Sequence, residues 1–366
     1  MRPSLRLMAV AMPLALTLAT TACGGDSGAT EKREVSAFSA TGDDALATQL
    51  KPKPLAERKT IRIGISSIVG SYAAVALADS LGEFEKENIQ IRFEFLQTQD
   101  ALVMMTQGNV DVLATQVSPG LLNLIASGED IRIVFPGGGR PESTDQGLYV
   151  NKSIFGDNGK FDLTDLKGVK LAGPGGNRPA LWASLFEHLK SNNVAIGPKD
   201  VEWQDLTSAD SINALRNGAV GAAYASTPYQ KVVADDACCE FVKGAIAPTT
   251  GVFYMFDDRL IKEDRETGLA FTRALARTTQ KYLLKDYRQA KEVVTALAAA
   301  QKIPEDSIRT TEPSAFEADY NVHTENASIY QSYYRSIDSG LLQYKDDLGE
   351  QNLFNTSFTE ELKNAG

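Results

Sequence analysis

The sequence predicts an α/β protein with two lobes, each a mostly parallel sheet flanked by helices, followed by a helical C-terminal tail. Its 366 residues exceed what one compact core of typical size holds. Strand-like and helix-like segments alternate from Thr60 onward, a pattern typical of parallel sheets. The two halves also repeat one arrangement. A helix stops at Gly108 or Gly218, a short strand of small residues follows, and a loop leads to Pro119 or Pro228 at a helix start.

The first lobe is predicted from apolar periodicity. Strand segments alternate apolar and polar residues, and helical segments place apolar residues at i, i+3 and i+4. Thr98 or Asp100 can cap one of the helices, which stops at Gly108. The expected order is strand 60–65, helix 71–86, strand 89–95, a helix to residue 107, strand 111–114, helix 119–126 and strand 131–135.

A second series follows an extended crossing at residues 147–150. Its expected elements are a strand ending at residue 172, helix 180–191, strand 201–204, helix 208–216, strand 221–225 and helix 228–233. Residues 251–256 predict a second crossing, residues 260–300 are helical, and further helices are expected around 315–322 and 329–336. These elements divide the chain into lobe 1 at 60–147, lobe 2 at 148–252, and a return to lobe 1 with C-terminal helices at 253–366.

The N-terminus is typical of an export signal. Arg2 and Arg6 precede an apolar stretch from residue 7 to about residue 19, followed by small residues. This stretch is shorter than the roughly 20 residues that span a bilayer. Cys23 then resembles the lipidated cysteine of a bacterial lipobox, although Thr20 stands where such boxes usually place Leu. We therefore expect a signal peptide at 1–22 and a lipidated Cys23 with a flexible tether at 23–59. The alternative is a plain secretory signal with soluble release.

Charge and cysteine content exclude several classes. Cleavage would remove two of 37 basic residues and none of 47 acidic ones, which leaves a formal charge of −12. Such an acidic chain is a poor nucleic-acid binder. The sequence has only two histidines, far apart, and no CxxC motif, so we expect neither a metal site nor a cofactor. Cys238 and Cys239 are adjacent, and two separate thiols are a simpler interpretation than a neighbour disulfide, which the sequence leaves open.

Four phrases of the chain together resemble the solute-binding proteins of ABC importers, in the branch that binds nitrate, taurine, alkanesulfonates and thiamine-pyrimidine precursors. They are residues 61–64 (IRIG), 81–89 (LGEFEKENI), 107–112 (QGNVDV) and 165–173 (DLKGVKLAG). The resemblance covers about residues 60–256, and it departs at Glu83, where the family usually has an aromatic residue. It implies the periplasmic-binding-protein type 2 fold, with two hinge strands and a ligand cleft between the lobes. The expected partners are a small solute, ABC permease subunits and, through the lipid anchor, the membrane.

The candidate ligand residues lie in loops between a strand end and a helix start, where open α/β sheets bind ligands and where helix N-termini favour anions. Hydroxyl and amide groups there could orient a polar head group, and two tyrosines could cover an apolar part. Ordinary capping and turn formation would also select these residue types. The candidates are Ser66, Ser67, Ser71, Tyr72, Thr115, Gln116 and Ser118 in lobe 1, and Gly175, Gly176, Asn177, Arg178, Ser226, Thr227 and Tyr229 in lobe 2.

Three charged residues could determine the ligand's charge. Arg178, in a Gly-rich loop, could clamp a carboxylate, sulfonate or phosphate with two parallel hydrogen bonds, or it could be a solvated side chain. Arg140, near the lobe junction, is a second candidate for the same role. Asp205 follows a strand and could instead meet a cationic ligand. The stretch from Gly173 to Gly176 is not a phosphate loop, because no Gly-Lys-Ser/Thr follows it.

We therefore expect a non-catalytic, monomeric lipoprotein on the outer face of a bacterial cytoplasmic membrane that delivers a solute to an ABC importer. The expected ligand is an organic anion, sulfonate-like, or a small heteroaromatic nutrient. One alternative is a sensor lipoprotein that presents the solute to a receptor. An enzyme of the thiamine-pyrimidine-synthesis type is disfavoured, because the Cys238–Cys239 pair is too short for its iron motif and the export signal does not suit it.

Overall fold

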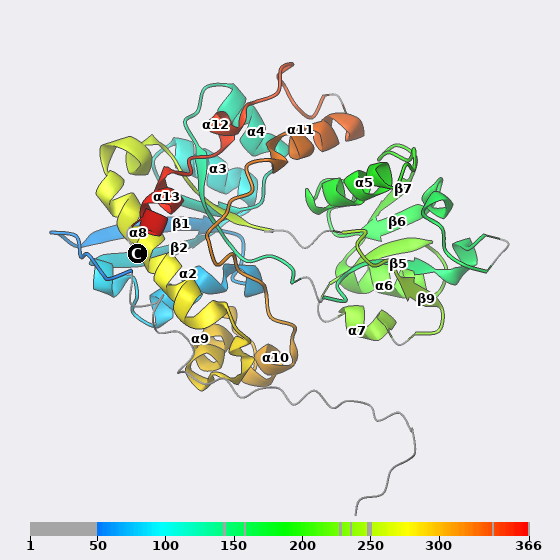
Figure 1. Cartoon of the computed structure of the whole chain (residues 1–366), viewed down its shortest axis with the longest axis horizontal. Helices are drawn as coiled ribbons and strands as arrows, with labels where there is room; N and C mark the ends of the chain where they lie inside the picture. The colour runs from blue at the N-terminus through cyan, green and yellow to red at the C-terminus, as the bar shows by residue number, and fades with distance from the viewer. Residues whose placement is uncertain are drawn as a thin grey trace, which may run out of the picture. The chain divides into compact units, whose positions relative to one another are not determined.

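The computed structural model describes residues 50–141, 144–156, 159–226, 229–234, 236–246, 251–338 and 340–364. Ten strands in this part of the chain form two five-stranded sheets, each flanked by helices (Figure 1). We call the sheet that begins with β1, and the helices on it, lobe 1, and the second sheet with its helices lobe 2. Cys23 and the predicted signal peptide lie outside the described residues.

The lobe 1 sheet has the strand order β2-β1-β3-β10-β4. β1 runs parallel to both neighbours, whereas β10 is antiparallel to β3 and β4. Ile61, Ile63 and Ile65 of β1 are buried, which is the alternation that predicts this strand. The strands are β1 (Lys59–Ile65), β2 (Ile89–Phe95), β3 (Val112–Thr115), β4 (Arg132–Pro136) and β10 (Phe253–Phe256).

The lobe 2 sheet repeats this arrangement in the order β7-β6-β8-β5-β9. β6 is parallel to β7 and β8, and β5 is antiparallel to β8 and β9. In each sheet the fourth strand, β10 or β5, therefore arrives from the other half of the chain. The strands are β5 (Gly147–Asn151), β6 (Lys170–Gly173), β7 (Glu202–Asp205), β8 (Ala222–Ala225) and β9 (Cys239–Phe241). The two-lobed α/β architecture predicted from the sequence is confirmed.

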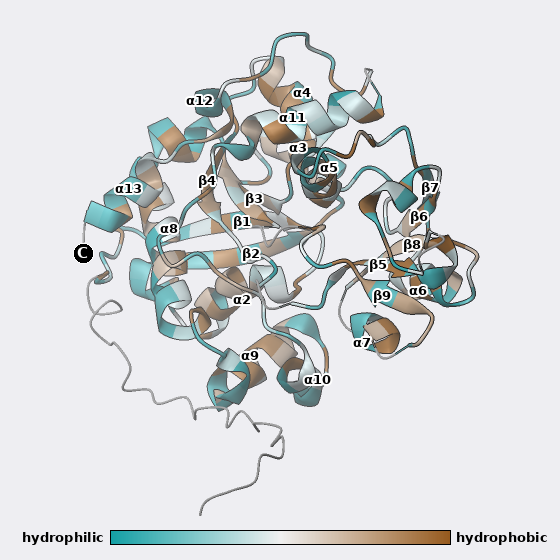
Figure 2. Cartoon of the chain, turned by 45° about the vertical axis from the view of Figure 1, so that its right-hand side comes forward, coloured by the Kyte–Doolittle hydropathy of each residue, from teal (hydrophilic) through white to brown (hydrophobic). Residues whose placement is uncertain are grey.

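Helices cover both sheets, with apolar residues on the faces toward the strands and polar residues outward (Figure 2). In lobe 1, α2 packs with α8 and α9, and α3 packs on β1 and β3. In lobe 2, α6 and α7 pack on β8, and the Trp182 ring of α5 contacts those of Trp203 and Tyr224. The helices are α2 (Ala73–Ser80), α3 (Thr98–Thr106), α4 (Pro119–Ala126), α5 (Leu181–Ser191), α6 (Ser208–Arg216), α7 (Tyr229–Ala234), α8 (Arg265–Thr278), α9 (Lys291–Gln301), α10 (Glu305–Thr310), α11 (Asn326–Ile337), α12 (Glu350–Leu353) and α13 (Ser357–Asn364).

The helix expected around residues 315–322 is wrong. Ala315 instead pairs with Gly139, each donating its N–H to the other's carbonyl (2.9 and 3.0 Å). Tyr320 and His323 have positive φ angles of 57° and 53°, which a right-handed helix does not allow. Ala315 therefore lies extended beside the connection between β4 and β5, and the positive φ angles at Tyr320 and His323 keep the rest of the segment out of a helix. The helical tail itself is confirmed, with α11 close to residues 329–336.

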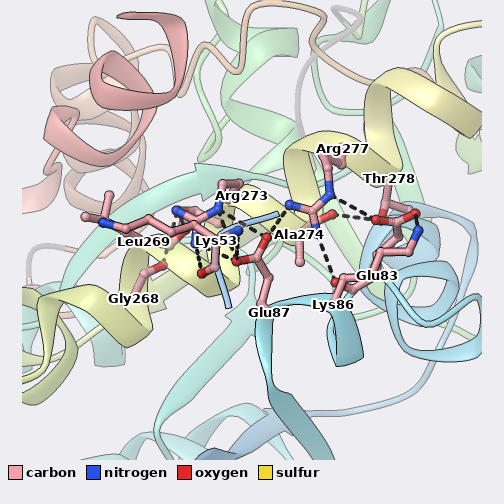
Figure 3. A network of polar contacts seen from close by, with 11 residues as sticks. Lys53, Glu83, Lys86, Glu87, Gly268, Leu269, Arg273, Ala274, Arg277 and Thr278 are labelled. Atoms are coloured by element: carbon pink, nitrogen blue, oxygen red, sulfur yellow. Dashed lines mark hydrogen bonds and ion pairs between the residues drawn. The ribbon is translucent and has the colours of Figure 1, made fainter. Parts of the chain in front are cut away.

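A buried charged network joins the segment before β1 to α8 (Figure 3). Arg273 donates to Glu87 Oε2 at 2.5 Å and to the Lys53 carbonyl at 2.9 Å, and the Lys53 N–H donates to Glu87 Oε2 at 3.2 Å. Arg277 pairs with both Glu83, at 2.9 Å, and Glu87. Leu50 is also buried in the lobe 1 core, with 3% of its surface exposed. Residues 50–59 are therefore docked on lobe 1, although the sequence predicts them to be part of the tether.

Cys238 and Cys239 are joined by a disulfide in the structure. Sequence reasoning left this pairing open and gave two separate thiols as the simpler interpretation. Cys239 also pairs with Asn151 in the ladder between β5 and β9, so the disulfide lies at the edge of the lobe 2 sheet. Within the described residues, no helix is both long and apolar enough to cross a bilayer.

Candidate functional site

The two interlobe crossings are the connection between β4 and β5 and the connection between β9 and β10, and they meet at the start of α2. The Gly137 N–H donates to the Val252 carbonyl (2.8 Å), and the Gly251 N–H donates to the Gly138 carbonyl (3.2 Å). The Gly138 N–H donates in turn to the Ser71 carbonyl at 2.7 Å. A pair of crossing strands hydrogen-bonded to each other is a geometry suited to a hinge.

Glycine is needed at the crossing because the backbones approach so closely. A Cβ atom on Gly138 would lie 2.9 Å from the Cα of Ser71 and 2.9 Å from Cζ of Phe316. A Cβ on Gly137 would lie 2.4 Å from a methyl carbon of Val252. Any side chain here would push the crossing away from α2 and from the extended segment at residue 315.

Arg140 is bound to the crossings and does not line the cavity described below. Its guanidinium donates to the carbonyls of Gln146 (2.9 Å) and Ile246 (2.7 Å), which belong to the two different crossings. Burial lowers the pKa of Arg140, and interactions with Tyr224 and Glu312 oppose that shift. Arg140 therefore forms hydrogen bonds with both interlobe crossings at the lobe junction.

The first lobe 1 loop exposes its serines and buries its tyrosine. Ser66 and Ser67, directly after β1, are exposed, and Ser71 is half-buried. Tyr72 belongs to the lobe 1 core with only 5% of its surface exposed, and burial raises its pKa above its ordinary value. The hydroxyl groups of Ser66 and Ser67 are thus accessible to a solute, whereas the Tyr72 ring packs in the core.

The second lobe 1 loop follows β3. Thr115 is buried and shares a 3.0 Å hydrogen bond with Thr98 at the start of α3. Ser118 caps α4, because its hydroxyl accepts from the Leu121 N–H at 3.3 Å. Gln116 is exposed between them. Of the three polar candidates in this loop, Gln116 is the one whose side chain the fold leaves available.

The Gly-rich loop of lobe 2 is held by Asp205. The Gly175 N–H donates to Asp205 Oδ1 at 2.9 Å, and Trp182 Nε1 donates to the Gly176 carbonyl at 2.9 Å. Both glycines have positive φ angles, 80° and 57°, which favour glycine at these turns. Arg178 is exposed, and within the described part of the chain its guanidinium makes no ion pair. Asp205 therefore shapes the loop, and Arg178 extends from it into solvent.

The last candidate loop leads into α7. Ser226 is half-buried, and its carbonyl accepts from the N–H groups of Tyr229 (2.7 Å) and Gln230 (3.1 Å). Tyr229 is partly buried against a lobe 2 apolar cluster that includes Val233. Thr227 lies outside the described residues.

Helix α11 contacts one candidate loop in each lobe. The Tyr334 hydroxyl donates to the Val117 carbonyl in lobe 1 at 2.9 Å, and the Tyr333 hydroxyl donates to the Asn177 carbonyl in lobe 2 at 2.7 Å. Tyr333 also stacks on Phe186 of α5, with ring centroids 6.0 Å apart. Figure 1 shows α11 beside α4 of lobe 1. Two adjacent tyrosines thus connect the lobe 1 loop after β3 with the lobe 2 loop before α5.

A cavity of about 420 Å³ lies between α5 on one side and α11 with the loop after β3 on the other. This volume lies within the usual range of small-molecule sites, about 300–1,000 Å³. Its walls are largely apolar and include Phe253 and Tyr330. The polar or ionisable side chains of the lining are Gln116, Ser184, Glu187, His188, Ser191, Asn326 and the Tyr330 hydroxyl; the other lining residues are Val117, Ala180, Leu181, Ala183, Gly244, Gly251, Phe253 and Ile329.

Of the residues predicted to bind ligand, Gln116 lines this cavity, and Asn177 and Ser118 lie in loops that adjoin it. Sequence reasoning missed the face of α5 that carries Glu187 and His188, and the face of α11 that carries Asn326 and Tyr330. Helical spacing could have indicated that each helix has two faces. It could not indicate that the partner face belongs to the other lobe.

Comparison with known proteins supports the fold. No family model and no curated relative matches the sequence. Among solved structures, the periplasmic aliphatic sulphonate-binding protein of Escherichia coli superposes with a TM-score of 0.57 at 21% identity, over 81% of this chain and 92% of that one. A periplasmic sulfonate-binding protein of an ABC transporter from Methylobacillus flagellatus gives a TM-score of 0.60 at 16% identity, over 85% and 95%.

The periplasmic nitrate-binding protein of Synechocystis is also similar, with a TM-score of 0.53 at 13% identity, over 85% of this chain and 89% of that one. At these identities the likeness establishes the fold. The two-lobed periplasmic-binding-protein architecture expected from the four sequence phrases is therefore confirmed.

Proposed function

We propose that this protein captures a small solute between its lobes outside the cytoplasmic membrane and delivers it to an ABC importer. The observation that carries the proposal is the cavity of about 420 Å³, whose lining comes from both lobes and from the crossings between them. A solute seated there would contact both lobes at once. Only a ligand with higher affinity for one lobe arrangement can shift the protein toward it, and contact with both lobes provides that difference.

The arrangement of the loops supports a binding role. Gln116, which lines the cavity, follows the end of β3, and the exposed Ser66 and Ser67 follow the end of β1; open α/β sheets hold ligands at such strand ends. Asp205 holds the Gly-rich loop in a fixed turn before any ligand arrives, which reduces the ordering cost of binding. Two ligand classes follow from the sequence, an organic anion such as a sulfonate and a small heteroaromatic nutrient, and the binding test below includes both.

The proposal includes the export route. After cleavage of residues 1–22, a lipidated Cys23 would retain the protein at the outer face of the cytoplasmic membrane, where the importer's permease subunits lie. Changing Cys23 to Ser should release the protein into the medium. If the mutant stays with the membrane, the lipid anchor is wrong, while solute capture remains to be judged by binding.

Binding is tested with the mature chain that begins at residue 23, carrying Cys23→Ser. A thermal-shift screen should cover sulfonates, nitrate, pyrimidines and flavins. A solute at 100 times its Kd stabilises the folded state by about 2.7 kcal/mol and raises the unfolding midpoint. The variant Ser184→Trp fills the cavity and should abolish the ligand-induced rise in the unfolding midpoint. The midpoint of the ligand-free variant should fall by less than the rise that the solute causes in the wild type. A panel in which no solute shifts the midpoint would contradict the proposal.

A further inference from the structure

The charges around the cavity indicate the class of solute, and this inference rests on the proposed function. The ionisable side chains among the described lining residues are Glu187, His188 and Tyr330, and none of the lining residues is Lys or Arg. Residues 247–250, which lie outside the described part, are Ala-Pro-Thr-Thr and carry no charge. The permanent charge that faces the cavity is therefore a carboxylate.

Neither arginine that the sequence offers for an anion is placed in the cavity. Arg140 donates to two crossing carbonyls and is largely buried at the lobe junction. Arg178 is exposed and is not part of the lining. An anion in the cavity would therefore meet the carboxylate of Glu187 without a guanidinium or ammonium group to balance it, which is unfavourable in a partly dry site.

The nearest cation to Glu187 does not neutralise it inside the cavity. Lys190 Nζ lies 3.9 Å from Glu187 Oε2, but the Lys190 side chain is 79% exposed and is not part of the lining. The Glu187 side chain is 42% exposed, so it has both a solvent side and a cavity side. An ion pair between two such exposed groups is weak.

The first turn of α5 itself uses two of the amides that a helix start could offer to an anion. The N–H groups of Trp182 and Ala183 already donate to the carbonyls of Pro179 (3.2 Å) and Ala180 (3.0 Å). Pro179 itself has no N–H. The amides of Trp182 and Ala183, two of those that a helix start normally offers to an anion, are thus used inside a tight first turn.

The apolar walls of the cavity favour a solute with an aromatic ring. Phe253 and Tyr330 contribute aromatic surface, and Val117, Leu181 and Ile329 contribute aliphatic surface. His188, Ser184 and Asn326 add hydrogen-bonding groups beside Glu187. From this combination we infer that the cavity takes an aromatic or heteroaromatic solute that carries a protonated amine, with its ring between α5 and α11 and its ammonium group toward Glu187.

Three probes with one benzyl scaffold separate charge from shape. Benzylamine is a cation at neutral pH, benzyl alcohol is neutral and phenylmethanesulfonate is an anion. Isothermal titration of the mature chain should rank benzylamine first, benzyl alcohol second and the sulfonate last. If the sulfonate binds as tightly as the amine or more tightly, the inferred class is wrong while solute capture stands. If none of the three binds, the inferred class is also wrong, and the broader solute screen then decides the proposed function separately.

Variants test whether the preference for a cationic solute arises in the cavity. Glu187→Gln should weaken benzylamine about tenfold, because a charge-assisted hydrogen bond is lost at a partly exposed site, and should leave benzyl alcohol within about twofold. Glu202→Gln removes an exposed carboxylate of the same lobe outside the cavity and should change neither affinity. Arg178→Ala should leave benzylamine binding unchanged. If Glu202→Gln loses benzylamine binding, the effect of charge is not specific to the cavity. If both Glu187→Gln and Ser184→Trp bind benzylamine as the wild type does, the amine does not bind in this cavity and the inference is wrong.

Discussion

The hydroxyl of Tyr333 donates a 2.7 Å hydrogen bond to the carbonyl of Asn177, 156 residues earlier in the chain and in the other lobe. Its neighbour Tyr334 donates to Val117 of lobe 1 at 2.9 Å. One turn of α11 thus contacts a candidate loop of each lobe. The bond from Tyr333 crosses between the lobes, whereas the bond from Tyr334 stays within one, so the two residues form a natural pair for experiment.

We predict that Tyr333→Phe loosens the contact between the lobes. The change removes one O–H group and leaves the Asn177 carbonyl without that donor, at a cost of about 1–3 kcal/mol if the carbonyl stays buried. Small-angle X-ray scattering of the ligand-free protein should therefore show a larger radius of gyration than for the wild type. The thermal midpoint should change less than the lobe separation does.

Tyr334→Phe is the matched control. It removes the same group from an adjacent residue, but its bond lies within lobe 1, so it should lower the midpoint and leave the radius of gyration unchanged. Equal expansion in both variants would contradict a special role for Tyr333.

We predict that His323 makes stability depend on pH near neutrality. Burial alone would lower the pKa of His323, but its hydrogen bonds to Glu317 (2.9 Å) and Glu325 (3.0 Å) outweigh burial and raise the pKa above 6.5. A histidine whose pKa is higher in the folded than in the unfolded state stabilises the fold fully at pH values below its unfolded-state pKa. This stabilisation is lost as the pH rises through its folded-state pKa. The midpoint difference between wild type and His323→Gln should therefore be largest near pH 6 and shrink by about pH 9. A difference that stays constant over this range would contradict the assignment.

We predict that Arg277→Met strongly destabilises lobe 1. The change removes one cationic partner from each of the buried carboxylates Glu83 and Glu87 (Figure 3), and breaking a buried pair typically costs about 3–5 kcal/mol. Lys281→Met is the control, because Lys281 is half exposed and lies 3.9 Å from Glu83; its loss should cost under about 1 kcal/mol. Urea unfolding measures both. Similar losses in the two variants would show that the buried network contributes no more than a surface pair.

Acid titration tests the same network. Burial by itself would raise the pKa of Glu83, but hydrogen bonds from Lys86 and Arg277 outweigh it, so the pKa is lowered from 4.5. A carboxyl group whose pKa is lower in the folded than in the unfolded state stabilises the fold at pH values above its unfolded-state pKa. This stabilisation is lost as the pH falls through its folded-state pKa. Stability should thus decline below about pH 4.5, and less steeply in Glu83→Gln. An equal slope in the variant would remove Glu83 from the acid response.

We predict that Cys238 and Cys239 resist alkylation until a reductant is added. Their sulfur atoms are bonded to each other, and the proposed export would place them in oxidising conditions, in which disulfides persist. Iodoacetamide labelling of the denatured Cys23→Ser variant, followed by mass spectrometry, should show neither cysteine modified without reductant and both modified after it. Labelling without reductant would show free thiols.

Local patterns predicted most of the fold. The alternation of Ile61, Ile63 and Ile65 identified β1, and the repeat of Gly–strand–Pro around residues 108–119 and 218–228 indicated two similar lobes. The site was harder to predict, because its cavity lies between α5 and α11, which are about 140 residues apart in the chain. Helical periodicity shows which face of a helix is apolar, but it does not show which other element packs against that face. The segment at 315–322 was mispredicted for the same reason, since the pairing of Ala315 with the backbone of Gly139, 176 residues earlier, leaves no local signal.

The docking of Leu50 and Lys53 on lobe 1 determines which half of the molecule would be fixed in an anchored protein. With Arg273 bonded to the Lys53 carbonyl, a pull on the N-terminal end is transmitted first to the sheet containing β1. Lobe 1 would then act as the stationary part, and lobe 2, joined to it by the two crossings, would be the part that swings.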